Sequence, residues 1–152
     1  MPKIEKASSE FDEWSKQMKE ESQKFVTGLF NTELDIKQEG NGVKLDFFLH
    51  NIFGEDLEFY FRSNQKFDIF VINQHGGEVY RLPQKTLPAQ VDVTLNKNEK
   101  LSFSEVWDYK NNKGNRVPPR KYSIKVILLA KLENGRIISP DALTAVKDIE
   151  ID

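Results

Sequence analysis

Two runs dense in Phe, Tyr, Ile and Val flank four polar residues in the stretch "EFYFRSNQKFDIFVIN", residues 58–73. Leu57, directly before this stretch, and Phe59 and Phe61 in its first run take alternate positions, which is the period of a strand that buries one face. The second run, "KFDIFVIN", carries apolar residues on both faces, so we expect a strand that is covered on both sides and central in its sheet. Residues 63–66 connect the two. The pattern predicts a fold built around a β core.

The period of two begins near residue 33 and continues through most of the chain. Turns at 75–77 ("HGG") and 133–136 ("ENGR") supply the positive φ angles of hairpins. The alternation breaks at Glu105 before Trp107, which predicts a β-bulge. Roughly eight to ten short strands separated by turns predict an all-β protein, an antiparallel β-sandwich. The other expected strands are 43–51, 78–82, 91–95, 101–107, 121–132 and 144–151.

Residues 1–30 follow a different pattern, with apolar residues roughly three, four and seven positions apart among Lys, Glu and Gln. This spacing predicts one short amphipathic helix within residues 8–27, with a serine N-cap and Gly28 near its end. The stripe packs on the chain's own domain or binds a partner, and packing is the commoner use. We expect a helical extension over 1–30 and a β domain over 31–152. The stripe consists of Phe11, Trp14, Met18, Phe25, Val26 and Leu29.

The composition restricts the class of protein. The chain has 152 residues, the size of one ordinary domain. It has no Cys, which excludes a disulfide framework, a thiolate metal site and a catalytic thiol. It also has no Asn-x-Ser/Thr sequon, no apolar signal core and no run of about 18 apolar residues. We therefore expect a cytoplasmic protein without a membrane segment.

Motifs for catalysis and for metal binding are missing from the sequence. The two histidines, His50 and His75, lie far apart, one at the end of an expected strand and one in a turn. No G-x-S-x-G motif, phosphate-binding glycine loop or Asp-x-Asp calcium loop occurs. We therefore expect no catalytic residue, no metal and no cofactor, and we interpret the chain as a protein that is not an enzyme.

Charge is distributed unevenly along a chain whose formal net charge is −2. The region from Tyr109 to Leu132 carries seven basic residues and no acid, which leaves 15 basic against 24 acidic residues elsewhere. Nucleic acid is one possible partner for such a cluster, but the sequence pI of about 5.8 argues against a polyanion binder. An acidic protein partner fits better. The seven residues are Lys110, Lys113, Arg116, Arg120, Lys121, Lys125 and Lys131.

Several motifs resemble, in order, those of the intracellular proteinase inhibitor family, often called BsuPI. The most specific piece is S-x-Q-x-F-D at 63–68, followed by E-V-aromatic-R at 78–81; "FSEVW" at 103–107 and "VPPRKYSIKVIL" at 117–128 come later. The resemblance covers roughly residues 43–130. The sequence differs from the family pattern in its turns. Glycine-containing patterns usual in the family are replaced there by Asn64, Lys97 to Glu99 and Arg120-Lys121. The signature residues are Ser63, Gln65, Phe67, Asp68, Glu78, Arg81, Trp107 and Tyr122.

The resemblance implies an immunoglobulin-like β-sandwich and inhibition of a subtilisin-like serine protease. We interpret Ser63, Asn64 and Gln65 as side chains that satisfy the backbone of a turn, with Asp68 continuing that bonding. On this interpretation the signature marks the fold rather than an active site. The competing class is an immunoglobulin-like interaction module without inhibitory activity, because a fold does not determine its function.

Two connections qualify as the protease-contact segment, which must be extended and exposed. The segment "RLPQKTLPAQ", residues 81–90, offers Leu82-Pro83 and Leu87-Pro88. A leucine followed by proline resists cleavage because proline lacks an N–H and fixes φ. We expect Leu82 or Leu87 to be the apolar anchor.

The second connection, "YKNNKGNRVPP" at residues 109–119, is basic and ends in Pro-Pro. Its Lys110, Lys113 and Arg116 are candidates for a secondary electrostatic contact with an acidic protease surface. For both connections the alternative is a plain link between strands.

Overall fold

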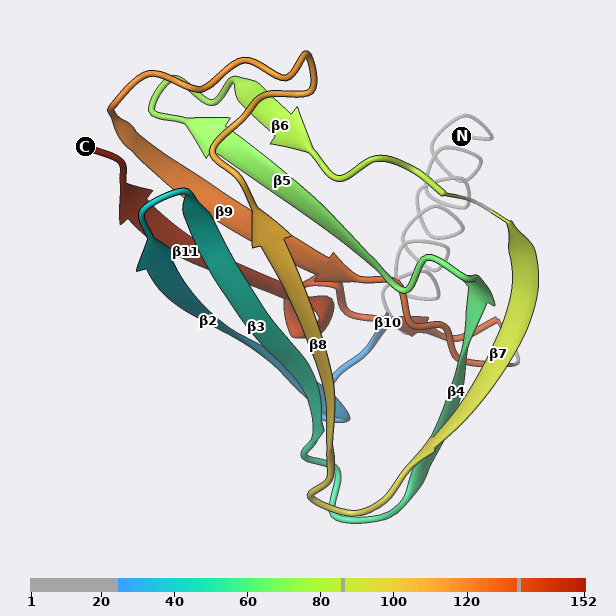
Figure 1. The fold of residues 1–152 in the computed structure, drawn as a ribbon. Helices are drawn as coiled ribbons and strands as arrows, with labels where there is room; N and C mark the ends of the chain where they lie inside the picture. Colours follow the sequence, from blue (N-terminus) through green and yellow to red (C-terminus); the bar gives the residue numbers. More distant parts are fainter. Residues whose placement is uncertain (1–24, 86, 134) are drawn as a thin grey trace, which may run out of the picture.

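The computed structural model describes residues 25–85, 87–133 and 135–152, which form eleven strands and one short 3-10 helix (Figure 1). This part of the chain is nearly all β, as the alternation predicted. None of its helices is long and apolar enough to cross a bilayer. Most of the helix expected within residues 8–27 lies outside the described residues.

Near the end of that expected helix, Phe25–Val26 instead form strand β1. β1 pairs in parallel with β10 (Ile137–Ile138), and the backbone N–H of Ser139 donates to the carbonyl of Val26 at 3.0 Å. Aromatic and β-branched residues favour strands when a partner strand is present. Gly28, with φ of +79°, lies in the turn after β1 rather than at a helix end.

One layer of the fold contains three antiparallel strands in the order β2-β3-β8. β2 (Phe30–Glu39) and β3 (Gly42–Asn51) form a long hairpin, and β8 (Lys100–Trp107) pairs with the other edge of β3. The register between β3 and β8 runs without a break, so the bulge predicted at Glu105 is wrong. Glu105 keeps its place in the alternation because β8 is an edge strand, where an inward carboxylate remains partly exposed.

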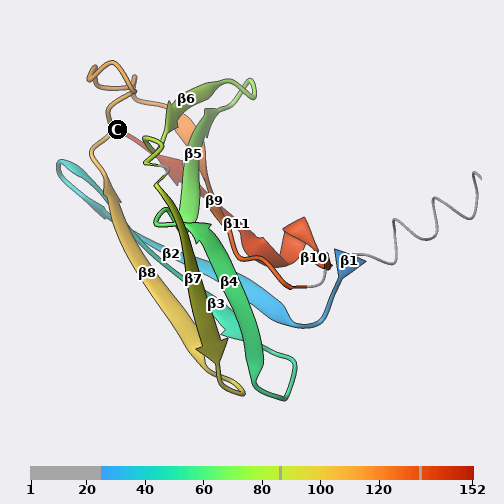
Figure 2. The same cartoon turned by 90° about the vertical axis from the view of Figure 1, so that its right-hand side faces the viewer.

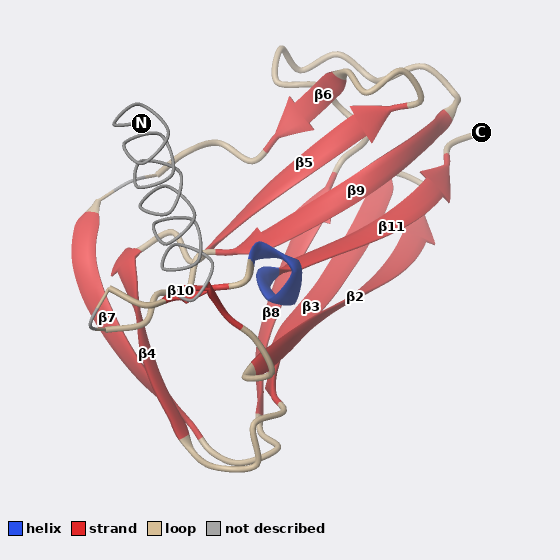
Figure 3. Ribbon diagram, turned by 180° about the vertical axis from the view of Figure 1, so that it is seen from behind, coloured by secondary structure: helices blue, strands red, loops and turns tan. Residues whose placement is uncertain are grey.

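The second layer contains four antiparallel strands in the order β11-β9-β5-β6 (Figure 3). They are β5 (Phe67–Asn73), β6 (Glu78–Arg81), β9 (Lys121–Leu128) and β11 (Thr144–Glu150), with the 3-10 helix η1 (Pro140–Leu143) before β11. β5 has a neighbour on each side, which confirms its central place in the sheet.

A separate antiparallel pair, β4 (Leu57–Ser63) and β7 (Pro88–Leu95), runs along one side of the molecule (Figure 2). A bridge between Tyr60 and Lys131 connects this pair to the chain that leaves β9. Because β4 and β7 are antiparallel, the start of β7 lies next to the turn at the end of β4, with Pro88 opposite Ser63.

Aromatic side chains fill the space between the strands of different sheets. The rings of Phe47 on β3 and Phe67 on β5 lie 4.8 Å apart, and those of Phe30 on β2 and Phe59 on β4 lie 5.2 Å apart. Such edge-to-face contacts add to the burial of large rings. The alternation in the sequence predicts that nine of the apolar side chains on these strands lie inside. Seven of the nine are buried and two, Phe67 and Phe103, are partly buried. The seven are Phe47, Phe59, Ile69, Val71, Trp107, Ile124 and Val126.

The two predicted hairpin turns differ in outcome. The turn at 75–77 joins β5 to β6, with φ of +80° at Gly76, and is confirmed. The segment 133–136 does not join an antiparallel pair, because β10 pairs with β1 and β9 pairs with β11. The apolar pair Ile137–Ile138 finds its partner near residue 25 rather than across the turn.

Candidate functional site

The candidate contact segment, residues 81–90, includes the end of β6, the connection to β7 and the start of β7 (Figure 1). Its two leucines differ in environment. Leu82 is partly buried against the core, and its N–H donates to the carbonyl of Ile69 at 2.9 Å. Leu87 is 67% exposed, and Pro83 and Pro88 are also exposed. The structure therefore presents Leu87 to solvent and uses Leu82 in packing.

The turn between β4 and β5 binds the backbone of this segment. The Gln65 side-chain oxygen accepts a hydrogen bond from the Lys85 N–H at 2.8 Å. The Asn64 side-chain oxygen accepts from the Leu87 N–H at 3.2 Å, and the Asn64 N–H donates to the Leu87 carbonyl at 3.3 Å. Ser63 bonds within its own turn, where its hydroxyl accepts from the Gln65 N–H. Asn64 and Gln65 thus join two connections that are about 20 residues apart in the sequence.

A buried carboxylate fixes the start of the same segment. Asp68 Oδ2 accepts from Arg81 Nη2 at 2.8 Å, and Oδ1 accepts from Gln84 Nε2 at 3.2 Å and from the Ile69 N–H at 3.0 Å. The hydrogen bond and the charge of Asp68 raise the pKa of Arg81, whose guanidinium also lies over the Phe70 ring at 4.9 Å. These bonds hold the end of β6 and Gln84 against β5.

Within the connection from β8 to β9, residues 109–119 form a compact loop. The N–H of Val117 donates to the Tyr109 carbonyl at 2.8 Å, and the Asn111 side-chain oxygen accepts from the N–H groups of Lys113 and Asn115, both at 3.0 Å. Tyr109 is buried with φ of +64°. The three exposed basic residues, called the loop cations below, therefore project from an ordered base. The loop cations are Lys110, Lys113 and Arg116.

Two signature residues bind this second loop. The indole N–H of the buried Trp107 donates to the Lys110 carbonyl at 2.9 Å, and the hydroxyl of Tyr122 donates to the Pro118 carbonyl at 2.6 Å. Burial raises the pKa of Tyr122. The signature therefore divides into one set of side chains at segment 81–90 and another at loop 109–119.

The remaining signature residues lie close to the first set. Phe67 is partly buried and packs on Phe47 at the start of β5, directly before Asp68. Glu78 is exposed at the start of β6, where its charge contributes to the raised pKa of Arg81. Neither side chain makes a hydrogen bond to segment 81–90 among those found in the described part of the chain.

Asn112 joins the two connections directly. The Arg81 N–H donates to Asn112 Oδ1 at 2.9 Å, and Asn112 Nδ2 donates to the Arg81 carbonyl at 2.7 Å. Sequence reasoning missed Asn112 and Gln84, because no periodicity relates a loop amide to a backbone 31 positions away. The sequence has no local signal that would have identified either contact.

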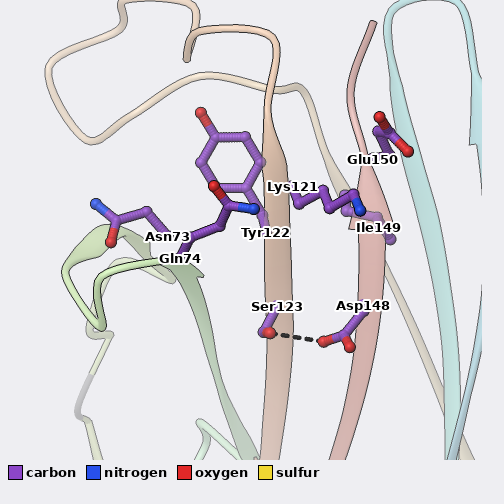
Figure 4. Close-up of a pocket in the computed structure, with 8 residues that line it drawn as sticks. All are labelled: Asn73, Gln74, Lys121, Tyr122, Ser123, Asp148, Ile149 and Glu150. Carbon is purple, nitrogen blue, oxygen red and sulfur yellow. Dashed lines mark hydrogen bonds between the residues drawn. The ribbon is translucent and has the colours of Figure 1, made fainter.

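A polar pocket lies elsewhere, between the end of β5 and the paired strands β9 and β11 (Figure 4). The Ser123 hydroxyl donates to Asp148 at 2.6 Å across these strands. Neither histidine lines the pocket, so Ser123 has no imidazole base beside it. Within residues 25–85, 87–133 and 135–152, no three His, Asp or Glu side chains gather as metal ligands would.

Individual proteins of known structure or function resemble this chain only weakly. No curated protein matches the chain. Two solved structures that resemble it are β-glucosidase from Listeria innocua in complex with glucose (13% identity, TM-score 0.38) and with gluconolactone (11%, 0.37). Each alignment covers 84% of this chain, which spans only 17% of the glucosidase chain. These scores are too low to support an argument about fold or function.

One family model matches the chain, over residues 30–133. The match begins with β2 and includes both connections and the side chains that bind them. It covers more than half of the sequence. The chain therefore belongs to the BsuPI family of intracellular proteinase inhibitors.

Proposed function

We propose that this protein inhibits a subtilisin-like serine protease in the cytoplasm and that Leu87 is the anchor of the contact. The observation that carries the proposal is the support of segment 81–90 by family signature residues, which leaves Leu87 67% exposed. The family supplies the expectation of a protease partner. The immunoglobulin-like arrangement of the sandwich is part of the same proposal.

Pre-organisation is the physical basis of the proposal. An inhibitor loop that is ordered before binding loses less conformational entropy in the complex. Gln65 and Asn64 bind the backbone of Lys85 and Leu87, while Asp68 binds Arg81 and Gln84. These bonds order the backbone of residues 85 and 87 and the side chains of Arg81 and Gln84 before the protease binds.

The hydrogen bonds of Leu87 modify the expected mode of binding. A peptide that joins a protease cleft as an added strand uses its own N–H and carbonyl groups. Both groups of Leu87 are already bonded to Asn64. We infer that the Leu87 side chain enters the apolar pocket while the Leu87-Pro88 bond stays poorly aligned for attack, which adds to the resistance that proline provides.

Substitution of Leu87 tests the proposal. Leu87→Asp removes an apolar side chain whose burial is worth about 1.5 to 3 kcal/mol, so we expect inhibition to weaken roughly ten- to a hundredfold. Val106→Asp is the matched control, because Val106 is also a strongly exposed apolar residue, at 61%, on β8. The measurement is the inhibition constant against a subtilisin-like protease.

Equal inhibition by the Leu87→Asp variant and the parent would contradict the assignment of the anchor. Leu82→Asp is unsuitable for this test, since the partly buried Leu82 also supports the core. If the unaltered protein does not inhibit any subtilisin-like protease, the non-inhibitory interaction module replaces this proposal.

A further inference from the structure

The geometry points to Asn112 as a positioning residue for segment 81–90, an inference that rests on the proposed inhibitory role of that segment. Its amide takes both backbone hydrogen-bonding groups of Arg81, at 2.9 Å to the N–H and 2.7 Å to the carbonyl. A single side chain thus replaces the neighbouring strand that the edge strand β6 lacks at this residue.

The position of Arg81 makes this contact consequential. Its backbone groups face loop 109–119, while the next N–H along the chain, that of Leu82, donates to Ile69 on β5. Its guanidinium reaches back to Asp68, which also accepts from Gln84. Arg81, the last residue of β6, is therefore fixed by Asp68 through its side chain and by β5 through the N–H that follows it. Asn112 binds the backbone groups of Arg81 that point away from the sheet.

Asn112 can position its neighbour because its own loop is anchored in the core. The indole of Trp107 donates to the Lys110 carbonyl, and the side-chain oxygen of Asn111 accepts from two N–H groups that follow Asn112. Trp107 is 1% exposed. Because the buried indole fixes the loop, Asn112 limits the motion of the chain after β6 more than the same side chain on a mobile loop would.

Loop 109–119 has a second role beside its charge. The loop cations were expected to act as a separate electrostatic contact, whereas Asn112 couples their loop to the segment that carries Leu87. A change at Asn112 should therefore weaken inhibition without any contact between Asn112 and the protease. Neutralising the loop cations should leave the segment ordered.

The test compares Asn112→Ala with Asn115→Ala, which alters an exposed asparagine of the same loop whose backbone, not its side chain, bonds to Asn111. We expect Asn112→Ala to increase amide hydrogen exchange at Arg81 and Lys85 by roughly tenfold, the scale of one lost hydrogen bond. Exchange at the core residue Val126 should not change. Asn112→Asp keeps the acceptor but loses the donor, so at neutral pH it should also raise exchange at these amides.

Inhibition is measured separately on the same variants. We expect Asn112→Ala to raise the inhibition constant while its melting temperature stays close to that of Asn115→Ala. A general loss of stability would instead lower the melting temperature of Asn112→Ala. Unchanged exchange at Arg81 and Lys85 in both Asn112 variants would overturn the positioning role, whatever the inhibition shows. If exchange at Arg81 and Lys85 rises in the Asn112 variants but the parent protein does not inhibit, the positioning role is retained and the proposed function is contradicted.

Discussion

Replacing Arg81 with methionine tests how far the buried carboxylate of Asp68 depends on its cationic partner. The side chain of Asp68 is 7% exposed and that of Arg81 is 45% exposed, with 2.8 Å between Asp68 Oδ2 and Arg81 Nη2. Methionine retains an aliphatic stem against the Phe70 ring, which the guanidinium now covers. The change therefore removes charge and hydrogen bonds but keeps much of the packing.

The expected magnitude lies between two limits. Removing one partner of a fully buried ion pair costs about 3 to 5 kcal/mol, whereas an exposed pair contributes about 0 to 1 kcal/mol. Here only the carboxylate is buried, and Gln84 and the Ile69 N–H continue to donate to it. We expect Arg81→Met to lower the free energy of unfolding by about 2 kcal/mol, or the melting temperature by roughly 4 to 8 °C.

Urea unfolding of a double-mutant cycle measures this dependence. In an Asp68→Asn background no buried charge remains, so Arg81→Met should cost less than about 0.5 kcal/mol there. Arg62→Met, at an exposed position on β4, controls for the loss of a positive charge. Equal costs of Arg81→Met in the two backgrounds would refute the reasoning, because the carboxylate would then not need its partner.

Substitutions at the loop cations, at Gly42 and at Tyr80 test other parts of the structure. Changing all three loop cations to glutamine should slow association with an acidic-rimmed protease by about tenfold at low salt and weaken its salt dependence; stopped-flow rates that stay unchanged would count against this. Gly42→Ala should cost about 1 to 3 kcal/mol in urea unfolding, because its Cβ would lie 2.7 Å from the Trp107 carbonyl oxygen; a variant as stable as the parent would show that β3 and β8 can separate. Burial raises the pKa of Tyr80 above its ordinary value of 10.0, so the stability from its neutral ring is present below pH 10 and is lost as pH rises through the higher folded value. Tyr80→Phe should flatten that alkaline loss in unfolding measured from pH 8 to 11, and an equally steep loss would contradict the assignment.

The strands could be predicted from the sequence because their signal is local. Alternation over 43–51, 67–73 and 121–132 reflects burial of one face or both, and the structure has strands over the first two ranges. In the third range the strand β9 ends at Leu128, four residues before the expected end. The break at Glu105 was misinterpreted, since a polar residue on an edge strand resembles a bulge in the sequence. The two-residue strands β1 and β10 were missed because their partners lie more than a hundred positions apart.

The candidate site was predictable only in part. The Leu-Pro pairs in a connection between strands predicted Leu87 as a candidate anchor, and the structure leaves this side chain 67% exposed. The partly buried state of Leu82 could not be deduced, since its side chain packs against a core that exists only in the folded chain. The bonds from Gln65 and Asn112 to the segment join residues 20 and 31 positions apart, and such contacts exist only once the sheets have formed.

Titration of a subtilisin-like protease with the intact protein tests the central claim most directly. Protease activity is measured across increasing molar ratios, and the recovered chain is weighed by mass spectrometry. We expect activity to fall to near zero at about one inhibitor per protease, the stoichiometry of a tight one-to-one complex, with the chain uncut at Leu87-Pro88. Undiminished activity at a large excess of the protein, or cleavage of the chain as an ordinary substrate, would contradict it.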